Sequence, residues 1–135
     1  MAVVLDSSIA AAWCFPGEQT AYTQAVLDAL VAPAEAFAPR LWAYEIRNSV
    51  LMGLRRQRIS RAHAEDFLDT IKNLPIRLSD PISYDAVLAL ATRHRLTVYD
   101  AAYLDLAIRE SLPLATLDNE LIRAAAQSNI DLFQP

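Results

Sequence analysis

A chain of 135 residues, 54% of them apolar and with a formal net charge of −4, has the length of one domain, residues 1–135, and can bury a core. Charges interrupt every long apolar stretch, which argues against a membrane-spanning helix of about 20 residues. The one cysteine, Cys14, excludes an internal disulfide, and no cysteine or histidine spacing suits zinc. Any metal is therefore expected to be a hard cation held by carboxylates.

The negative charge argues against simple electrostatic capture of nucleic acid. A cluster of acids that holds divalent cations gives the same balance while the rim of the site stays basic. A run of arginines is interpreted as a solvated helix end: Arg55, Arg56, Arg58 and Arg61. The high apolar fraction also predicts that some apolar side chains face a second copy of the chain.

The first segment predicts a buried parallel strand, because Ala2–Leu5 is a continuous apolar run. It lacks a charged leader, and we expect a cytoplasmic protein. Asp6 follows the strand, at the edge of an open α/β sheet where ligands bind. Ser7 or Ser8 is expected to cap a helix over residues 9–15.

Helical and strand-like patterns then alternate. We expect a helix over residues 20–31 that ends before Pro33, a strand over residues 36–38 and a long helix over residues 41–56. Glu45 lies at the margin of the apolar stripe of the long helix, with no basic partner on that helix. Because an uncompensated acid beside a core is costly, Glu45 is predicted to be functional. The alternative is a surface position with a partner from another element.

The second half continues the alternation. Ser60 is expected to cap a helix over residues 61–73, before a strand over residues 75–78 and a helix over residues 83–93. Another helix is expected to run to Glu110, and within it Asp105 precedes Arg109 by four residues. This spacing predicts a structural ion pair.

Asp100 follows a β-branched and aromatic run, residues 97–99, at the start of that helix. Taken alone, Asp100 is interpreted as the N-cap, where an anion is favoured. Three helical residues share its inward face: Tyr103, Leu104 and Ala107.

The last segments repeat the first arrangement. A strand over residues 113–117 ends at Asp118, which is also a candidate cap for a helix over residues 121–126. Asp6 and Asp118 come to adjacent strands if the crossovers are right-handed. A final strand is expected over residues 130–132, and the alternation predicts an α/β fold.

Four carboxylates at one edge of a parallel sheet repel one another unless they hold a cation: Asp6, Glu45, Asp100 and Asp118. Mg²⁺ or Mn²⁺ suits such a site. One or two such ions activate water and stabilise the leaving oxygen of a phosphodiester, which is metal-assisted nuclease chemistry.

Four segments carry a family resemblance in order and spacing: residues 4–8, Pro39 with residues 42–48, residues 98–104 and residues 115–118. On these segments the sequence resembles the PIN-domain ribonucleases, and in particular the VapC toxins of bacterial and archaeal toxin–antitoxin pairs. The resemblance implies a three-layer α/β/α domain with a short, mainly parallel central sheet. It also implies a Mg²⁺- or Mn²⁺-dependent endoribonuclease that acts as the toxin of a type II system, forms a homodimer and is inhibited by a small antitoxin.

The resemblance also assigns residues. The family's acidic quartet matches Asp6, Glu45, Asp100 and Asp118, and its supporting positions match Ser8, Asn48 and Thr116. Asp105 departs from the family, which more often has a small or apolar residue there. The expected mechanism is in-line attack of a metal-activated water on an RNA phosphorus.

Within this mechanism Asp6 and Asp100 are expected to be the most direct metal ligands. Glu45 and Asp118 would complete the shell, bind a second ion or orient the water. Three basic residues are expected either to guide RNA or to meet acidic side chains of the antitoxin: Arg47, Arg55 and Arg56.

Other functions fit less well. A phosphatase of the haloacid dehalogenase type needs a second aspartate where this chain has Ser8, and a receiver domain needs a late lysine, whereas the only lysine is Lys72. Two alternatives stay open. One is a PIN-domain RNA-processing nuclease without an antitoxin, and the other is a non-catalytic interaction module.

Overall fold

The computed structural model describes residues 1–31 and 34–135. Four strands are found there: β1 (Ala2–Leu5), β2 (Glu35–Pro39), β3 (Ile76–Ser79) and β4 (Leu114–Ala115). The helices of the same residues are α1 (Ser7–Cys14), α2 (Ala21–Val31), α3 (Leu41–Arg55), α4 (Arg61–Lys72), α5 (Tyr84–His94), α6 (Val98–Glu110) and α7 (Asn119–Gln127). The expected end of the second helix before Pro33 lies outside the described residues.

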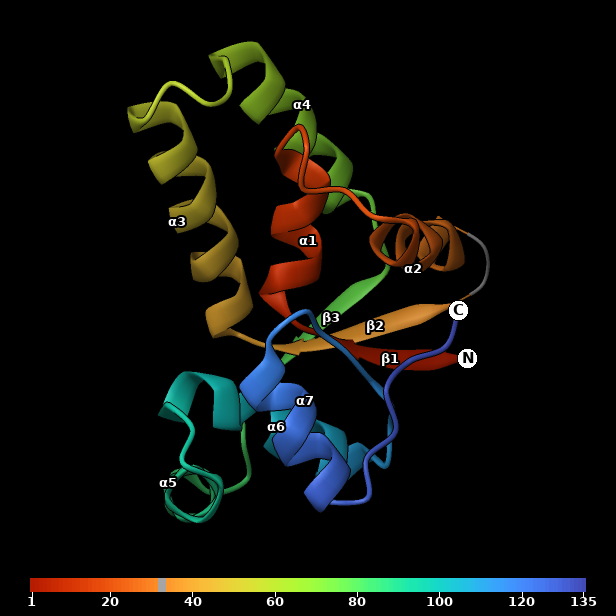
Figure 1. The fold of residues 1–135 in the computed structure, drawn as a ribbon, viewed down its shortest axis with the longest axis vertical. Coiled ribbons are helices and arrows are strands. Elements are labelled where there is room, and N and C mark those ends of the chain that lie inside the picture. The colour runs from red at the N-terminus through yellow and green to blue at the C-terminus, as the bar shows by residue number, and fades with distance from the viewer. Residues whose placement is uncertain (32–33) are drawn as a thin grey trace.

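The strands form one parallel sheet in the order β3-β2-β1-β4. In β1, Val3 pairs with Ala36 and Val4 pairs with Leu114. Helices α1 to α4 lie on one side of the sheet and α5 to α7 on the other (Figure 1). The predicted three-layer α/β/α fold is confirmed, and β1 and β4 are neighbours, as expected for the strands that precede Asp6 and Asp118.

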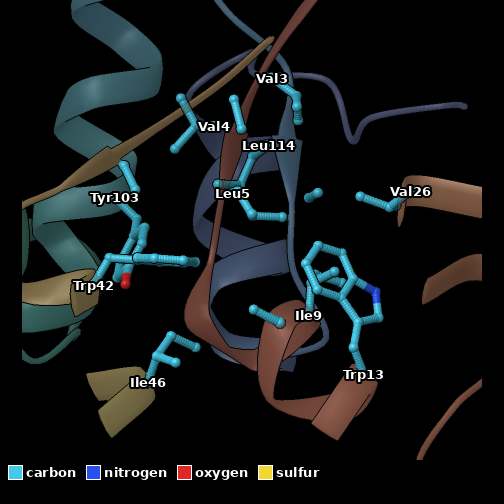
Figure 2. Packing of buried hydrophobic residues seen from close by; sticks show 14 of the residues in the cluster. Val3, Val4, Leu5, Ile9, Trp13, Val26, Trp42, Ile46, Tyr103 and Leu114 are labelled. Atoms are coloured by element: carbon cyan, nitrogen blue, oxygen red, sulfur yellow. The ribbon is translucent and has the colours of Figure 1, made fainter. Parts of the chain in front are cut away.

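Strand β1 is buried on both faces, as its continuous apolar run predicts. Val3, Val4 and Leu5 are fully buried. Val4 points to the side on which Tyr103 lies, and Val3 points to the other side (Figure 2). The central position of β1 therefore ties the two helical layers together and fixes the place of the residue that follows it, Asp6.

An expected cap and an expected ion pair are confirmed. Ser60 caps α4 by accepting the His63 N–H, as predicted, and Ser83, which was not predicted as a cap, accepts the Ala86 N–H at the start of α5. Arg109 pairs with Asp105 at 2.9 Å in a half-buried contact. Within residues 1–31 and 34–135, no helix has the length and apolar character needed to cross a membrane.

The start of α1 differs from the expectation that Ser7 or Ser8 caps it. The helix already begins at Ser7, and Asp6 stands at the N-cap position without a side-chain capping bond. Ser8 is the second residue of the helix and does not cap it: its hydroxyl donates to the Asp6 carboxylate and accepts the Leu117 N–H.

The C-terminal strands are shorter than expected. Strand β4 covers Leu114–Ala115 only, and beyond it the Leu117 N–H donates to the Ser8 hydroxyl. The strand expected over residues 130–132 is wrong: Leu132 forms a single bridge with Leu114. The chain touches the sheet edge there without building a ladder.

A stability prediction follows from the contact between α1 and α3. A Cβ added at Gly53 would lie 2.8 Å from Phe15 Cζ and closer to Cε1. Overpacking costs about 1–3 kcal/mol, which outweighs the gain of about 1 kcal/mol that alanine brings to a helix interior. We expect Gly53→Ala to lower the free energy of unfolding in urea by about 1 kcal/mol and Phe15→Leu to relieve that loss. A Gly53→Ala protein more stable than wild type would contradict this packing.

Candidate active site

The Asp6 carboxylate is buried directly after the central strand, with 4% of the residue exposed. Two hydroxyls from different elements donate to its Oδ2 atom: Ser8 Oγ at 2.6 Å and Thr116 Oγ1 at 2.8 Å. Neither Ser8 nor Thr116 donates to Oδ1. The predicted supporting positions Ser8 and Thr116 are thus in direct contact with a predicted acid.

Backbone groups hold both hydroxyls in turn. The Leu117 N–H donates to Ser8 Oγ at 3.0 Å, and the Asp118 N–H donates to Thr116 Oγ1, also at 3.0 Å. Because each hydroxyl accepts one bond while it donates to Asp6, its proton direction is fixed. The segment after β4 therefore orients Asp6.

Asp118 takes part in local structure as well as lying near Asp6. Its Oδ1 atom accepts the Leu121 N–H at 2.9 Å and caps α7. The capping interpretation of Asp118 is confirmed, and it leaves Oδ2 outside that bond.

Asp100 lies in the first turn of α6, and its interpretation as the N-cap is wrong. Thr97 is the N-cap, because its hydroxyl accepts the Asp100 N–H at 3.1 Å. The Asp100 carboxylate is therefore not used as a cap. The expected inward face of α6 is confirmed by three buried residues: Tyr103, Leu104 and Ala107.

Glu45 is half-buried on α3 and accepts a hydrogen bond from Tyr103 of α6 at 2.5 Å. We did not predict this contact from the sequence. A signal was present, because a tyrosine on an inward helix face needs a partner for its hydroxyl. Burial raises the pKa of the Tyr103 hydroxyl, and Glu45 raises it further, so the tyrosine is the donor of this bond.

Burial is the main cause of a raised pKa at Asp6, Glu45 and Asp100. Neighbouring acids raise these pKa values further. Asp118 acts on Asp6 and Asp100, and both Asp6 and Asp100 act on Glu45. The hydroxyls of Ser8, Tyr103 and Thr97 lower the pKa values of Asp6, Glu45 and Asp100, respectively, and so oppose the shifts. The four acids thus interact as one electrostatic group.

Among residues 1–31 and 34–135, none of these four acids forms an ion pair with a basic side chain. The ion pairs in the described part of the chain all involve other acids. Such an arrangement of unpaired, partly buried carboxylates is typical of a cation site.

The side chains fit a hard divalent cation by their chemistry, since all four are carboxylates. Among residues 1–31 and 34–135, no three His, Cys, Asp or Glu side chains lie in an arrangement that holds a metal ion by itself. Mg²⁺ keeps several waters and needs only one or two carboxylates. The residues present therefore fit a largely hydrated ion and not a closed protein cage.

Asn48, the third predicted supporting residue, lies apart from this network. It is exposed and lines a cleft of about 270 Å³ between α1 and α3, together with Phe15 and Arg56. The hydrogen bonds of the described residues do not join Asn48 to the acids.

Arg58, one of the four clustered arginines, already has two partners. Its guanidinium pairs with Glu18 at 3.1 Å and lies over the Phe15 ring, 4.5 Å from the ring centroid.

A protein family and a known relative both match most of this chain. The PIN domain family matches residues 3–127. Ribonuclease VapC3 of Pyrobaculum aerophilum is 33% identical over 125 residues, which cover 90% of this chain and 92% of that protein.

Solved structures share the fold at lower identity. PAE2754 from Pyrobaculum aerophilum has a TM-score of 0.68 at 22% identity, over 92% of this chain and 84% of that one. VapBC2 from Rickettsia felis, solved bound to a DNA fragment from its promoter, has a TM-score of 0.66 at 15% identity, over 98% of each chain. FitAcB from Neisseria gonorrhoeae has a TM-score of 0.66 at 18% identity, over 100% and 98%. With the family matching nearly the whole chain and the predicted sheet in place, this protein belongs to the PIN-domain family.

Proposed function

We propose that this protein is a metal-dependent endoribonuclease of the VapC type, the toxin of a toxin–antitoxin pair, that hydrolyses RNA phosphodiester bonds. The observation that carries the proposal is the group of acids around Asp6, partly buried, mutually repelling and without a cationic partner. The relative named Ribonuclease VapC3 supports the activity. The fold shared with VapBC2 supports an antitoxin as partner.

In this proposal Asp6 and Asp100 hold Mg²⁺ or Mn²⁺ most directly, and Glu45 and Asp118 complete the shell, bind a second ion or orient water. When bound, such an ion lowers the pKa of water and stabilises charge on the phosphate. Ser8 and Thr116 keep Asp6 Oδ2 occupied and so direct Oδ1 to the site.

Three exposed arginines are available for RNA phosphates or for acidic antitoxin side chains: Arg47, Arg55 and Arg56. None of them forms an ion pair in the described part of the chain. Arginine suits both partners, because its planar fork matches phosphate and carboxylate oxygens.

We also propose a cytoplasmic homodimer. Large apolar side chains are exposed around α5 and the start of α6: Ile82 (87%), Tyr84 (76%), Tyr99 (65%), Leu88 (55%) and Val98 (47%). Such a patch is typical of a protein–protein contact. Sedimentation equilibrium tests the homodimer: purified protein should have the mass of two chains, and the mass of one chain would rule the dimer out.

The activity is tested with purified, antitoxin-free protein on a panel of structured RNAs with Mg²⁺, Mn²⁺ or chelator. We expect metal-dependent cleavage that Asp100→Asn reduces more than about 100-fold, beyond the loss typical of a residue outside the metal's direct ligands. Asp69→Asn, at an exposed acid of α4, is the matched control and should cleave as wild type does.

Folded protein that cuts no RNA under any of these conditions would contradict the proposal and favour an interaction module. Cleavage that chelator or Asp100→Asn leaves unchanged would refute the metal mechanism.

The raised pKa values of Asp6, Glu45 and Asp100 predict that metal-free stability falls as pH rises. Their contribution is complete below the unfolded-state values near pH 4 and is lost as pH rises through the higher folded-state values. Asp100→Asn removes one repelling charge. In EDTA at pH 7 we expect this variant to unfold about 3 °C above wild type, and near pH 4 the difference should shrink. A variant that is less stable than wild type at pH 7 would show that Asp100 serves the fold and not a cation.

A further inference from the structure

The hydrogen bond between Tyr103 and Glu45 joins two helices on opposite sides of the sheet. Tyr103 is fully buried on α6, and its hydroxyl reaches Glu45 Oε1 across 58 residues of sequence. Figure 2 shows the Tyr103 ring beside Trp42, which belongs to the same helix, α3, as Glu45. The two helices therefore approach each other where this hydrogen bond forms.

This contact differs from the hydrogen bond of Tyr22, a partly buried tyrosine of α2. Tyr22 donates to a backbone carbonyl, that of Phe133, at 3.0 Å. A backbone carbonyl is a neutral acceptor, so this bond gives the tyrosine hydroxyl a partner without involving a charged group. Tyr103 instead donates to a carboxylate that neighbouring acids repel, so its bond acts on the candidate site as well as on the core.

Glutamate has three side-chain torsions, and a free carboxylate can present either oxygen or rotate to water. The Tyr103 hydroxyl occupies Oε1, and Ser7 nearby also lowers the pKa of Glu45. Repulsion from Asp6 and Asp100 favours rotation of Glu45 away from the group. A fixed donor on a buried ring opposes that rotation.

We propose that Tyr103 is a positioning residue, which holds Glu45 against repulsion in the orientation that presents Oε2 to the cation site. This inference rests on the proposed function, because the oriented carboxylate serves a bound divalent ion. Tyr103 itself touches neither metal nor RNA in this account.

The test measures Mn²⁺ affinity by electron paramagnetic resonance of free Mn²⁺, without RNA. Tyr103→Phe keeps the buried ring and removes the donor, and we expect about tenfold weaker binding, the lower end of what loss of a supporting hydrogen bond costs a metal site. Tyr22→Phe deletes a partly buried hydroxyl that bonds to the Phe133 carbonyl and not to an acid, and this variant should bind Mn²⁺ as wild type does. Circular dichroism and thermal unfolding confirm that both variants fold.

A second pair of variants separates positioning from general loosening of the fold. If Tyr103 acts through Glu45, adding Tyr103→Phe to Glu45→Gln should change Mn²⁺ affinity no further. An additional tenfold loss in that background would refute positioning through Glu45.

The outcomes also separate this inference from the proposed function. Wild-type Mn²⁺ affinity in folded Tyr103→Phe, with RNA cleavage intact, overturns the inference alone. Wild-type protein that binds no Mn²⁺ and cuts no RNA overturns both.

Discussion

A buried carboxylate without a cationic partner is the constraint on which the rest of this structure depends. Asp6 follows the central strand and is 4% exposed, yet the bonds it receives from Ser8 and Thr116 come from neutral hydroxyls. Burial of an unpaired charge is costly. The parallel pairing of β1 between β2 and β4 holds Asp6 in place and brings the Thr116–Asp118 segment against it. The fold thus maintains an electrostatically unfavourable group that a divalent cation would relieve.

The two sides of the sheet contribute differently to this group. On one side α3 carries Glu45, and on the other α6 carries Asp100 and Tyr103. The Tyr103–Glu45 bond links these layers at the candidate site. Packing of the whole domain therefore determines where the acids lie. The hydroxyl donors determine how the individual carboxylates of Asp6 and Glu45 are oriented.

Periodicity predicted most elements, because a long apolar stripe identifies a helix such as α3 and a continuous apolar run identifies a buried strand such as β1. Predictions were wrong where side chains compete for backbone groups. Thr97 and Asp100 are both good caps, and only the position of the first turn decides between them. Serine is also a favoured cap residue, but the Ser8 hydroxyl donates to the buried Asp6 carboxylate. The Tyr103–Glu45 contact joins residues 58 apart, and no local pattern contains it.

The acids around Asp6 form no ion pairs with basic residues of the described chain, which leaves them available to a metal ion. This is tested by crystals grown with Mn²⁺, with data collected at a wavelength that gives manganese anomalous signal. We expect an anomalous peak between Asp6 and Asp100, with Asp6 contacting the ion through Oδ1 while Ser8 and Thr116 remain on Oδ2. If the crystal is saturated with Mn²⁺ and manganese peaks appear only elsewhere on the protein, these acids do not form the metal site.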